Sequence, residues 1–152
     1  MEIRVQEAPF ALGAESDAFA ARAEGAGVQA GALVTFTGVV RDADRGGLLA
    51  MEIEHYPGMT EKALTAIAEE ASRRWSLADV LVIHRHGRLA PGERIMMVAT
   101  AARHRKDAFE AAEFLMDYLK SRAPFWKKEI LAGGDTEWVA AKDSDEEALT
   151  RW

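Results

Sequence analysis

The fold is decided by IMMVATAARHRKDAFEAAEFLMDYLKSRAP, residues 95–124. An apolar run at Ile95–Ala101 predicts a strand, and residues 106–122 then carry apolar side chains at helical spacing. Pro124 ends this helix, because the residue before a proline avoids the helical region. The expected core stripe of the helix consists of Phe109, Ala112, Leu115, Met116 and Leu119.

The flanking segments add short strands and further helices. Strands are expected at Glu2–Gln6, Ala32–Val40, Leu48–His55, Val80–His84, Lys128–Leu131 and Glu137–Ala140. Helices are expected at 15–24, with Ser16 as the cap, at Thr60–Trp75, and as a final turn after Asp143. This pattern predicts an α+β sandwich, with the helices on one face of a largely antiparallel sheet, in one domain spanning residues 1–152.

Composition narrows the function. Nearly half of the 152 residues are apolar (49%) and 29% are charged, as in an ordinary globular protein. The chain has no cysteine, so any sulfur that it handles must come from another molecule. No secretory signal and no apolar run of about 20 residues is visible, so we expect a cytoplasmic protein. Without a glycine-rich phosphate loop, nucleotide-dependent chemistry is not expected.

Charge is unevenly distributed. The whole chain is -6, but residues 103–128 hold seven Lys/Arg against four acids. Within this segment Arg103, His104 and Arg105 follow a strand and precede a helix, where free N–H groups favour anions and arginine can bind phosphate or carboxylate through two hydrogen bonds. The pattern suits a small anionic ligand, although solvated surface charge gives the same composition.

The lysines near Pro124 are a second candidate. Spacing alone favours an ordinary helix-end role for Lys120, which complements the helix dipole. The segment Phe125-Trp126-Lys127-Lys128 is either an interface anchor or an apolar wall that lowers a lysine pKa and makes the amine a usable base or nucleophile. In an extended segment, at most one of the two adjacent lysines points inward.

His84 and His86 would share one face of a strand, as two metal ligands would. No third ligand stands at a metal-site spacing, so structural or surface roles are favoured and neither a metal nor a cofactor is expected. Arg41 would stand at a strand end, as a ligand-binding or an ordinary edge arginine.

Longer stretches carry a family resemblance. They are VTFTGVVRD (34–42), EHYPGMTEKAL (54–64), VIHRHGRLAPGE (82–93), AARHRKDAFEA (101–111) and LMDYLKSRAPFWKKE (115–129). In this order, and over most of the chain, they resemble the signature stretches of the molybdopterin synthase large subunit family.

The resemblance implies an α/β-hammerhead-type fold with a small β-rich extension. It also implies a sulfurtransferase that converts cyclic pyranopterin monophosphate (precursor Z) into molybdopterin. The sulfur would arrive as a thiocarboxylate on the C-terminal Gly-Gly of a small ubiquitin-like carrier subunit. Two copies of the large subunit would form a central homodimer with one carrier on each, a heterotetramer.

The resemblance also assigns residues. Lys120 and Lys127 match the family's catalytic lysines, and Phe36, Arg41, His104 and Arg105 match its substrate-pocket positions. Lys142 stands where the family usually has an arginine that reaches across from the neighbouring chain, and lysine lacks the bidentate fork. We add Arg103 to the substrate patch, and Met116, with Phe36 and Phe125, to a groove for the carrier tail.

Two other readings fit the residues alone. One is a non-catalytic α+β regulatory domain that binds an anionic metabolite through the basic patch. The other is a scaffold or dimerisation domain anchored by Phe125 and Trp126.

Overall fold

A four-stranded sheet forms the centre of the protein. It consists of β1 (Glu2–Gln6), β4 (Asp79–Arg85), β6 (Arg94–Ala102) and β2 (Ala32–Val39), in that spatial order. Only the β1–β4 pair is parallel. All seven residues of β4 are buried, which requires cover on both faces of the sheet. The computed structural model describes residues 1–27 and 29–152.

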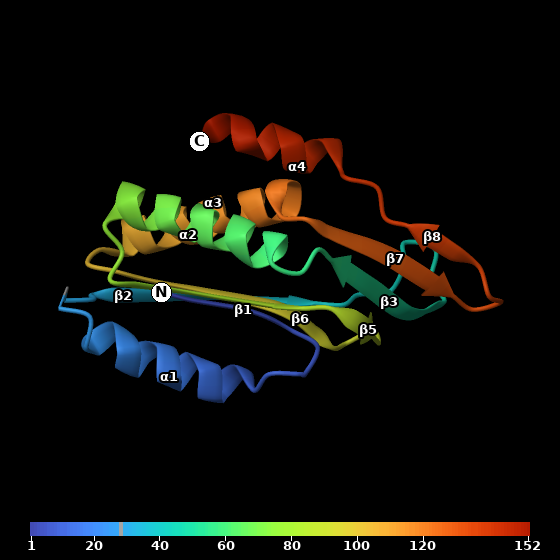
Figure 1. The fold of residues 1–152 in the computed structure, drawn as a ribbon, viewed down its shortest axis with the longest axis horizontal. Helices are drawn as coiled ribbons and strands as arrows, with labels where there is room; N and C mark the ends of the chain where they lie inside the picture. The colour runs from blue at the N-terminus through green and yellow to red at the C-terminus, as the bar shows by residue number, and fades with distance from the viewer. Residues whose placement is uncertain (28) are drawn as a thin grey trace.

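Helices cover both faces of this sheet (Figure 1). Helices α2 (Met59–Trp75) and α3 (Arg105–Arg122) lie side by side on one face, and α1 (Leu12–Glu24) lies on the other. The expectation that the helices share one face is therefore wrong for α1. Its Phe19 is fully buried against strand residues that include Leu81 and Met97. The uninterrupted apolar run of β4 places side chains on both faces, and each face needs a helix.

A smaller antiparallel sheet forms the β-rich extension. Its strands are β5 (Gly87–Leu89), β3 (Leu48–His55), β7 (Phe125–Leu131) and β8 (Thr136–Trp138), in that order. It projects from one end of the central layers (Figure 1). The chain then returns over α3 through α4 (Asp143–Ala148) and the short helix η1 (Leu149–Arg151). The mixed α+β architecture with this extension confirms the expected fold class.

Some element boundaries and core positions differ from the expectation. Helix α1 begins at Leu12, and Ser16 lies inside it, where its hydroxyl donates to the Leu12 carbonyl at 2.8 Å instead of capping the helix. Phe109, expected in the core stripe of α3, is 63% exposed, whereas Phe114 is 1% exposed. Strand β7 begins directly after Pro124, three residues before its predicted start.

No helix in the described part of the chain is long and apolar enough to cross a bilayer.

Candidate functional site

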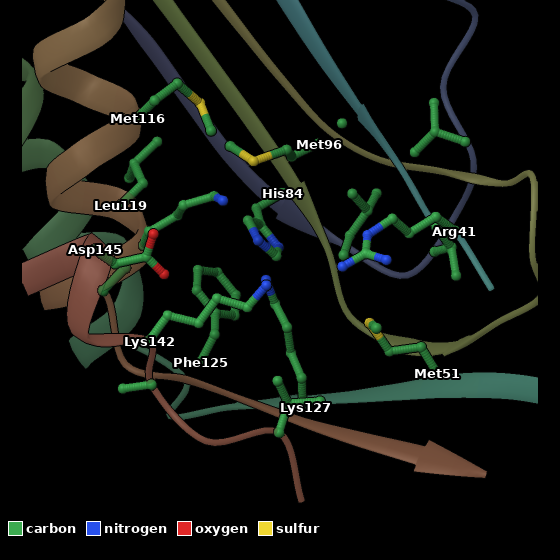
Figure 2. A pocket seen from close by; sticks show the side chains of 18 of the residues that line it. Arg41, Met51, His84, Met96, Met116, Leu119, Phe125, Lys127, Lys142 and Asp145 are labelled. Carbon is green, nitrogen blue, oxygen red and sulfur yellow. The ribbon is translucent and has the colours of Figure 1, made fainter. Parts of the chain in front are cut away.

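A cavity of about 560 Å³ opens where the central sheet, the smaller sheet and the C-terminal end of α3 meet (Figure 2). Strand β2 and the loop after it form one wall, the last two turns of α3 and the start of β7 form another, and the segment before α4 closes one side. Side chains from six regions of the sequence therefore converge on one space. Its charged and aromatic lining residues are Phe36, Arg41, Asp42, Asp44, His84, Lys120, Phe125, Lys127, Glu129, Lys142 and Asp145.

Lys120 and Lys127 both line this cavity. Lys120 lies in the last turn of α3, and Lys127 lies on β7. Between them Ala123 is extended, with ψ 133°, as a residue before proline should be, so the chain passes from helix to strand within a few residues. This abrupt change places the two lysines, seven positions apart, around the same space.

Strand alternation separates Lys127 from its neighbours. Lys127 points into the cavity (Figure 2), while the Lys128 amine lies 5.2 Å from the centre of the Trp138 ring, on the other face of the strand. Trp126 is 49% exposed. The prediction that only one of the two adjacent lysines points inward is confirmed.

The environment of Lys127 favours its neutral form. Burial lowers the pKa of the Lys127 amine, and the positive charge of Lys120 lowers it further, while Asp145 acts in the opposite direction. Neither lysine forms an ion pair with any described residue. Lys127 therefore releases a proton more readily than a solvated lysine, and Lys120 helps to cause this.

We expect Lys120→Met to raise the pKa of Lys127, because the substitution removes a like charge that disfavours the ammonium form. The ¹³Cε resonance of Lys127, followed through a pH titration, measures this directly. Lys120→Arg keeps the charge and is the matched control, in which the Lys127 pKa stays low. A Lys127 pKa that falls or does not move in Lys120→Met would contradict the proposed coupling between the two amines.

His84 lines the cavity, although the sequence gave it only a structural or surface role. It is 3% exposed, and its ring stacks on Phe125 with centroids 3.7 Å apart and planes 18° apart. Its Nδ1 lies 2.8 Å from the Arg85 carbonyl oxygen. Burial and the Lys127 charge lower the pKa of His84 to about 3. The structural role predicted for this histidine is present in its packing, but the residue also lines the cavity.

The described residues contain no group of three or more His, Asp or Glu side chains placed to hold a metal ion.

The loop after β2 brings Arg41 to the rim. Arg41 Nη1 donates to Asp44 Oδ1 at 2.8 Å, and this contact, together with the charge of Lys142, lowers the pKa of Asp44. Asp42 Oδ1 accepts hydrogen bonds from the backbone N–H groups of Ala43 and Leu48, each at 2.8 Å, which fixes the shape of the loop. Of the four acidic side chains at the cavity, Asp42 and Asp44 thus already accept hydrogen bonds within the loop.

Lys142 lines the cavity of its own chain and points into it (Figure 2). Its place follows from the segment before α4, which runs beside β7 and carries Val139, Ala140 and Ala141 along the same wall. Phe36 and Met116 also line the cavity, together with Phe125.

The basic patch Arg103–Arg105 lies elsewhere. All three side chains are exposed, and His104 is the residue before the first turn of α3. Lys120 is 15 positions after Arg105 along this helix, which corresponds to roughly 22 Å at 1.5 Å per residue. Within one chain, the structure does not bring this patch to the cavity.

Comparisons with known proteins agree closely. The family model described as MoaE protein matches residues 5–122. The molybdopterin synthase catalytic subunit of Cereibacter sphaeroides is 68% identical over 152 residues, the full length of both chains. The solved molybdopterin biosynthesis MoaE protein from Burkholderia ambifaria is 53% identical, with a TM-score of 0.80 over 99% of this chain and 97% of that one. The crystal structure of molybdopterin synthase from Staphylococcus aureus is 29% identical, with a TM-score of 0.77 over 90% and 96% of the two chains.

Proposed function

Because this chain belongs to the MoaE protein family, we propose that it is the catalytic subunit of a molybdopterin synthase, an enzyme of molybdenum cofactor biosynthesis. We further propose that it transfers sulfur from a thiocarboxylated carrier protein to cyclic pyranopterin monophosphate. The observation that carries this second step is the meeting of Lys120 and Lys127 in a cavity of a chain without cysteine, where neither lysine pairs with an acid of the described residues.

The chemistry needs positive charge more than a nucleophile on this chain. The thiocarboxylate sulfur forms a bond to a substrate carbon while a carbon–oxygen bond at that carbon breaks, its oxygen leaving as water or remaining on the phosphate. Water then cleaves the acyl–sulfur bond. The carrier leaves as a carboxylate and the sulfur stays on the substrate, so two such transfers complete the dithiolene. Each transfer develops negative charge, which a fixed cation in a water-poor site stabilises.

The two lysines suit different parts of this chemistry. Lys120 holds the thiocarboxylate and stabilises the charge that develops during attack and hydrolysis. Lys127, with its lowered pKa, serves as a proton donor and acceptor or as a second anion clamp. The second assignment is supported by the burial of Lys127, which lowers its pKa, and by the lack of an ion pair between Lys127 and any described residue.

The carrier tail needs a narrow groove, because Gly-Gly offers no side chains to recognise. Phe36, Met116 and Phe125 line the cavity together and supply apolar walls for such a tail. The absence of side chains on the tail lets its backbone pass close to Lys120 and Lys127.

Replacing the carrier's penultimate glycine with valine is expected to lower kcat/KM by about 10- to 100-fold, because overpacking a close-fitting site typically costs 1–3 kcal/mol. Turnover with purified carrier variants measures the effect. A valine introduced at a solvent-exposed position of the carrier's globular part is the matched control and leaves the rate unchanged. Normal turnover with the tail variant would refute the groove.

The basic patch at the start of α3 fits a second copy of the chain. Since Arg103, His104 and Arg105 lie roughly 22 Å from their own Lys120 by helix length, we assign them to the cavity of the neighbouring subunit in a homodimer. Arg41 and Lys142 bind the phosphate from within the chain. In this proposal Arg103, His104 and Arg105 cross the interface, whereas the resemblance gave that role to Lys142.

The direct test is reconstitution. Purified chain is mixed with a thiocarboxylated carrier and cyclic pyranopterin monophosphate, and the dithiolene product is measured. Product formation supports the proposal. Binding of the pterin phosphate without any product, using a carrier shown to be active with a known synthase, would instead favour a non-catalytic binding domain.

A further inference from the structure

The proposed function gives no role to one nitrogen atom of the cavity wall, Nε2 of His84. His84 is the residue before the last one of β4. Its ring is held on two sides, by the stacked Phe125 ring and by the hydrogen bond to the Arg85 carbonyl. A ring held in this way presents its remaining nitrogen, Nε2, in one defined direction. The residue lies among the labelled side chains at the centre of the cavity (Figure 2).

The hydrogen bond also fixes the tautomer. A carbonyl oxygen only accepts, so the 2.8 Å contact with Arg85 requires the hydrogen to be on Nδ1. Nε2 then keeps its lone pair and is a hydrogen-bond acceptor. Burial and the nearby Lys127 lower the pKa of His84 to about 3, so the ring stays neutral near pH 7 and Nε2 keeps this character.

Nε2 has no hydrogen-bond partner among the described residues. The fully buried side-chain atoms without a partner in this part of the chain are Arg4 Nε, Arg22 Nη2 and His55 Nδ1. Since Nε2 of His84 is not one of them, the small exposed area of this residue includes Nε2, and the space that it meets is the cavity. An acceptor that faces the cavity in one fixed direction would lose its contact with water when a ligand fills the space, so a ligand that binds well there needs a donor opposite Nε2.

The four cationic groups around it cannot take this part, and the acceptors that remain besides it among the charged lining residues are the carboxylates of Glu129 and Asp145. Lys120, Lys127, Lys142 and Arg41 only donate hydrogen bonds. Asp42 and Asp44 are engaged by loop N–H groups and by Arg41.

We propose that Nε2 of His84 accepts a hydrogen bond from an N–H or O–H group on the uncharged ring system of the substrate, while Arg41 and Lys142 bind its phosphate. This rests on the proposed function for the identity of the substrate, a pterin phosphate. His84 is then a substrate-binding residue that sets the orientation of the ring system and so determines which carbon faces the incoming sulfur.

The test compares two ligands and two substitutions. His84→Phe keeps a flat ring for stacking on Phe125 but removes the acceptor, and His84→Gln restores an acceptor oxygen. Calorimetry gives the Kd of cyclic pyranopterin monophosphate and of sulfate, an anion with no donor group. We expect the pterin phosphate to bind about 5- to 150-fold more weakly to His84→Phe, the range typical of leaving a buried donor unpaired.

The other measurements distinguish the loss of one hydrogen bond to the substrate from a general disruption of the site. Sulfate affinity should not change in His84→Phe, and His84→Gln should recover part of the pterin phosphate affinity. Equal weakening of both ligands would show a merely structural role and overturn the proposal, as would an unchanged Kd for the pterin phosphate.

A measurement on the unaltered chain avoids dependence on a buried substitution. The ¹⁵N resonance of His84 Nε2 should move upfield when the pterin phosphate binds and should not do so with sulfate. Binding of the pterin phosphate without this shift would overturn the contact with His84 alone. Failure of the unaltered chain to bind the pterin phosphate at all would overturn the proposed function and this contact with it.

Discussion

Lys120→Ala is expected to lower the turnover of the reconstituted enzyme by about 10²–10³-fold, the usual cost of removing one preorganised group that stabilises developing negative charge. Lys120 lines the cavity from the last turn of α3, and it forms no ion pair with any described residue that would explain its presence structurally. The loss should fall mainly on kcat, because the interaction strengthens as charge develops.

Lys62→Ala is the matched control for this experiment. Lys62 is an exposed lysine on α2, outside the cavity, so its removal should leave turnover within the error of the assay. Near-normal turnover by Lys120→Ala would move the chemistry to Lys127 and would refute the role given to Lys120.

Phe114→Ala should lower the free energy of unfolding by about 3–5 kcal/mol, as expected for truncating a buried phenylalanine to alanine. Phe114 is 1% exposed. Its ring centre lies 5.2 Å from that of Trp75, 4.4 Å from that of Tyr118 and 5.5 Å from that of Trp152. The substitution therefore removes the centre of an aromatic cluster that joins α2, α3 and the C-terminus.

Urea denaturation measures this change, and the same helix offers a control. Phe109 is 63% exposed, so Phe109→Ala should change the free energy of unfolding by no more than about 0.5 kcal/mol. If the two variants lost similar stability, the packing of α3 described above would be wrong.

The contrast between these two phenylalanines shows what the sequence of α3 left undetermined. Helical spacing correctly predicted a long helix before Pro124, with Ala112, Leu115 and Leu119 buried. The same spacing placed Phe109 in the stripe and left Phe114 out, which was wrong for both residues. Only the packing of α2 and of Trp152, which is distant in sequence, selects Phe114.

The smaller sheet was partly predictable. Strand β3 was expected with its observed bounds, because a weakly alternating segment lies between the turn signals Gly46-Gly47 and Pro57-Gly58. Strand β5 is three residues long and too short to produce a pattern. The place of α1 on the second face of the central sheet depends on the double-sided burial of β4, which a continuous apolar run permits but does not require.

Prediction of the site depended on the resemblance. Spacing alone favoured an ordinary helix-end role for Lys120, because nothing local shows that the chain turns back at Pro124 and brings Lys127 to the same space. His84 gave no signal as a cavity residue, since its neighbours Phe125 and Lys127 are about forty positions away and become adjacent only through the fold. Arg103–Arg105 had the strongest local signal for anion binding, yet the patch lies at the far end of α3 from the lysines.

The central claim is that this chain moves sulfur from a carrier thiocarboxylate onto a pterin phosphate in the cavity of Lys120 and Lys127. It is tested most directly by loading the carrier with ³⁵S at its terminal thiocarboxylate and counting the label in the product. We expect two labelled sulfurs per dithiolene, with the carrier recovered as a carboxylate. Product without label, or label that stays on the carrier while the pterin phosphate is bound, would contradict it.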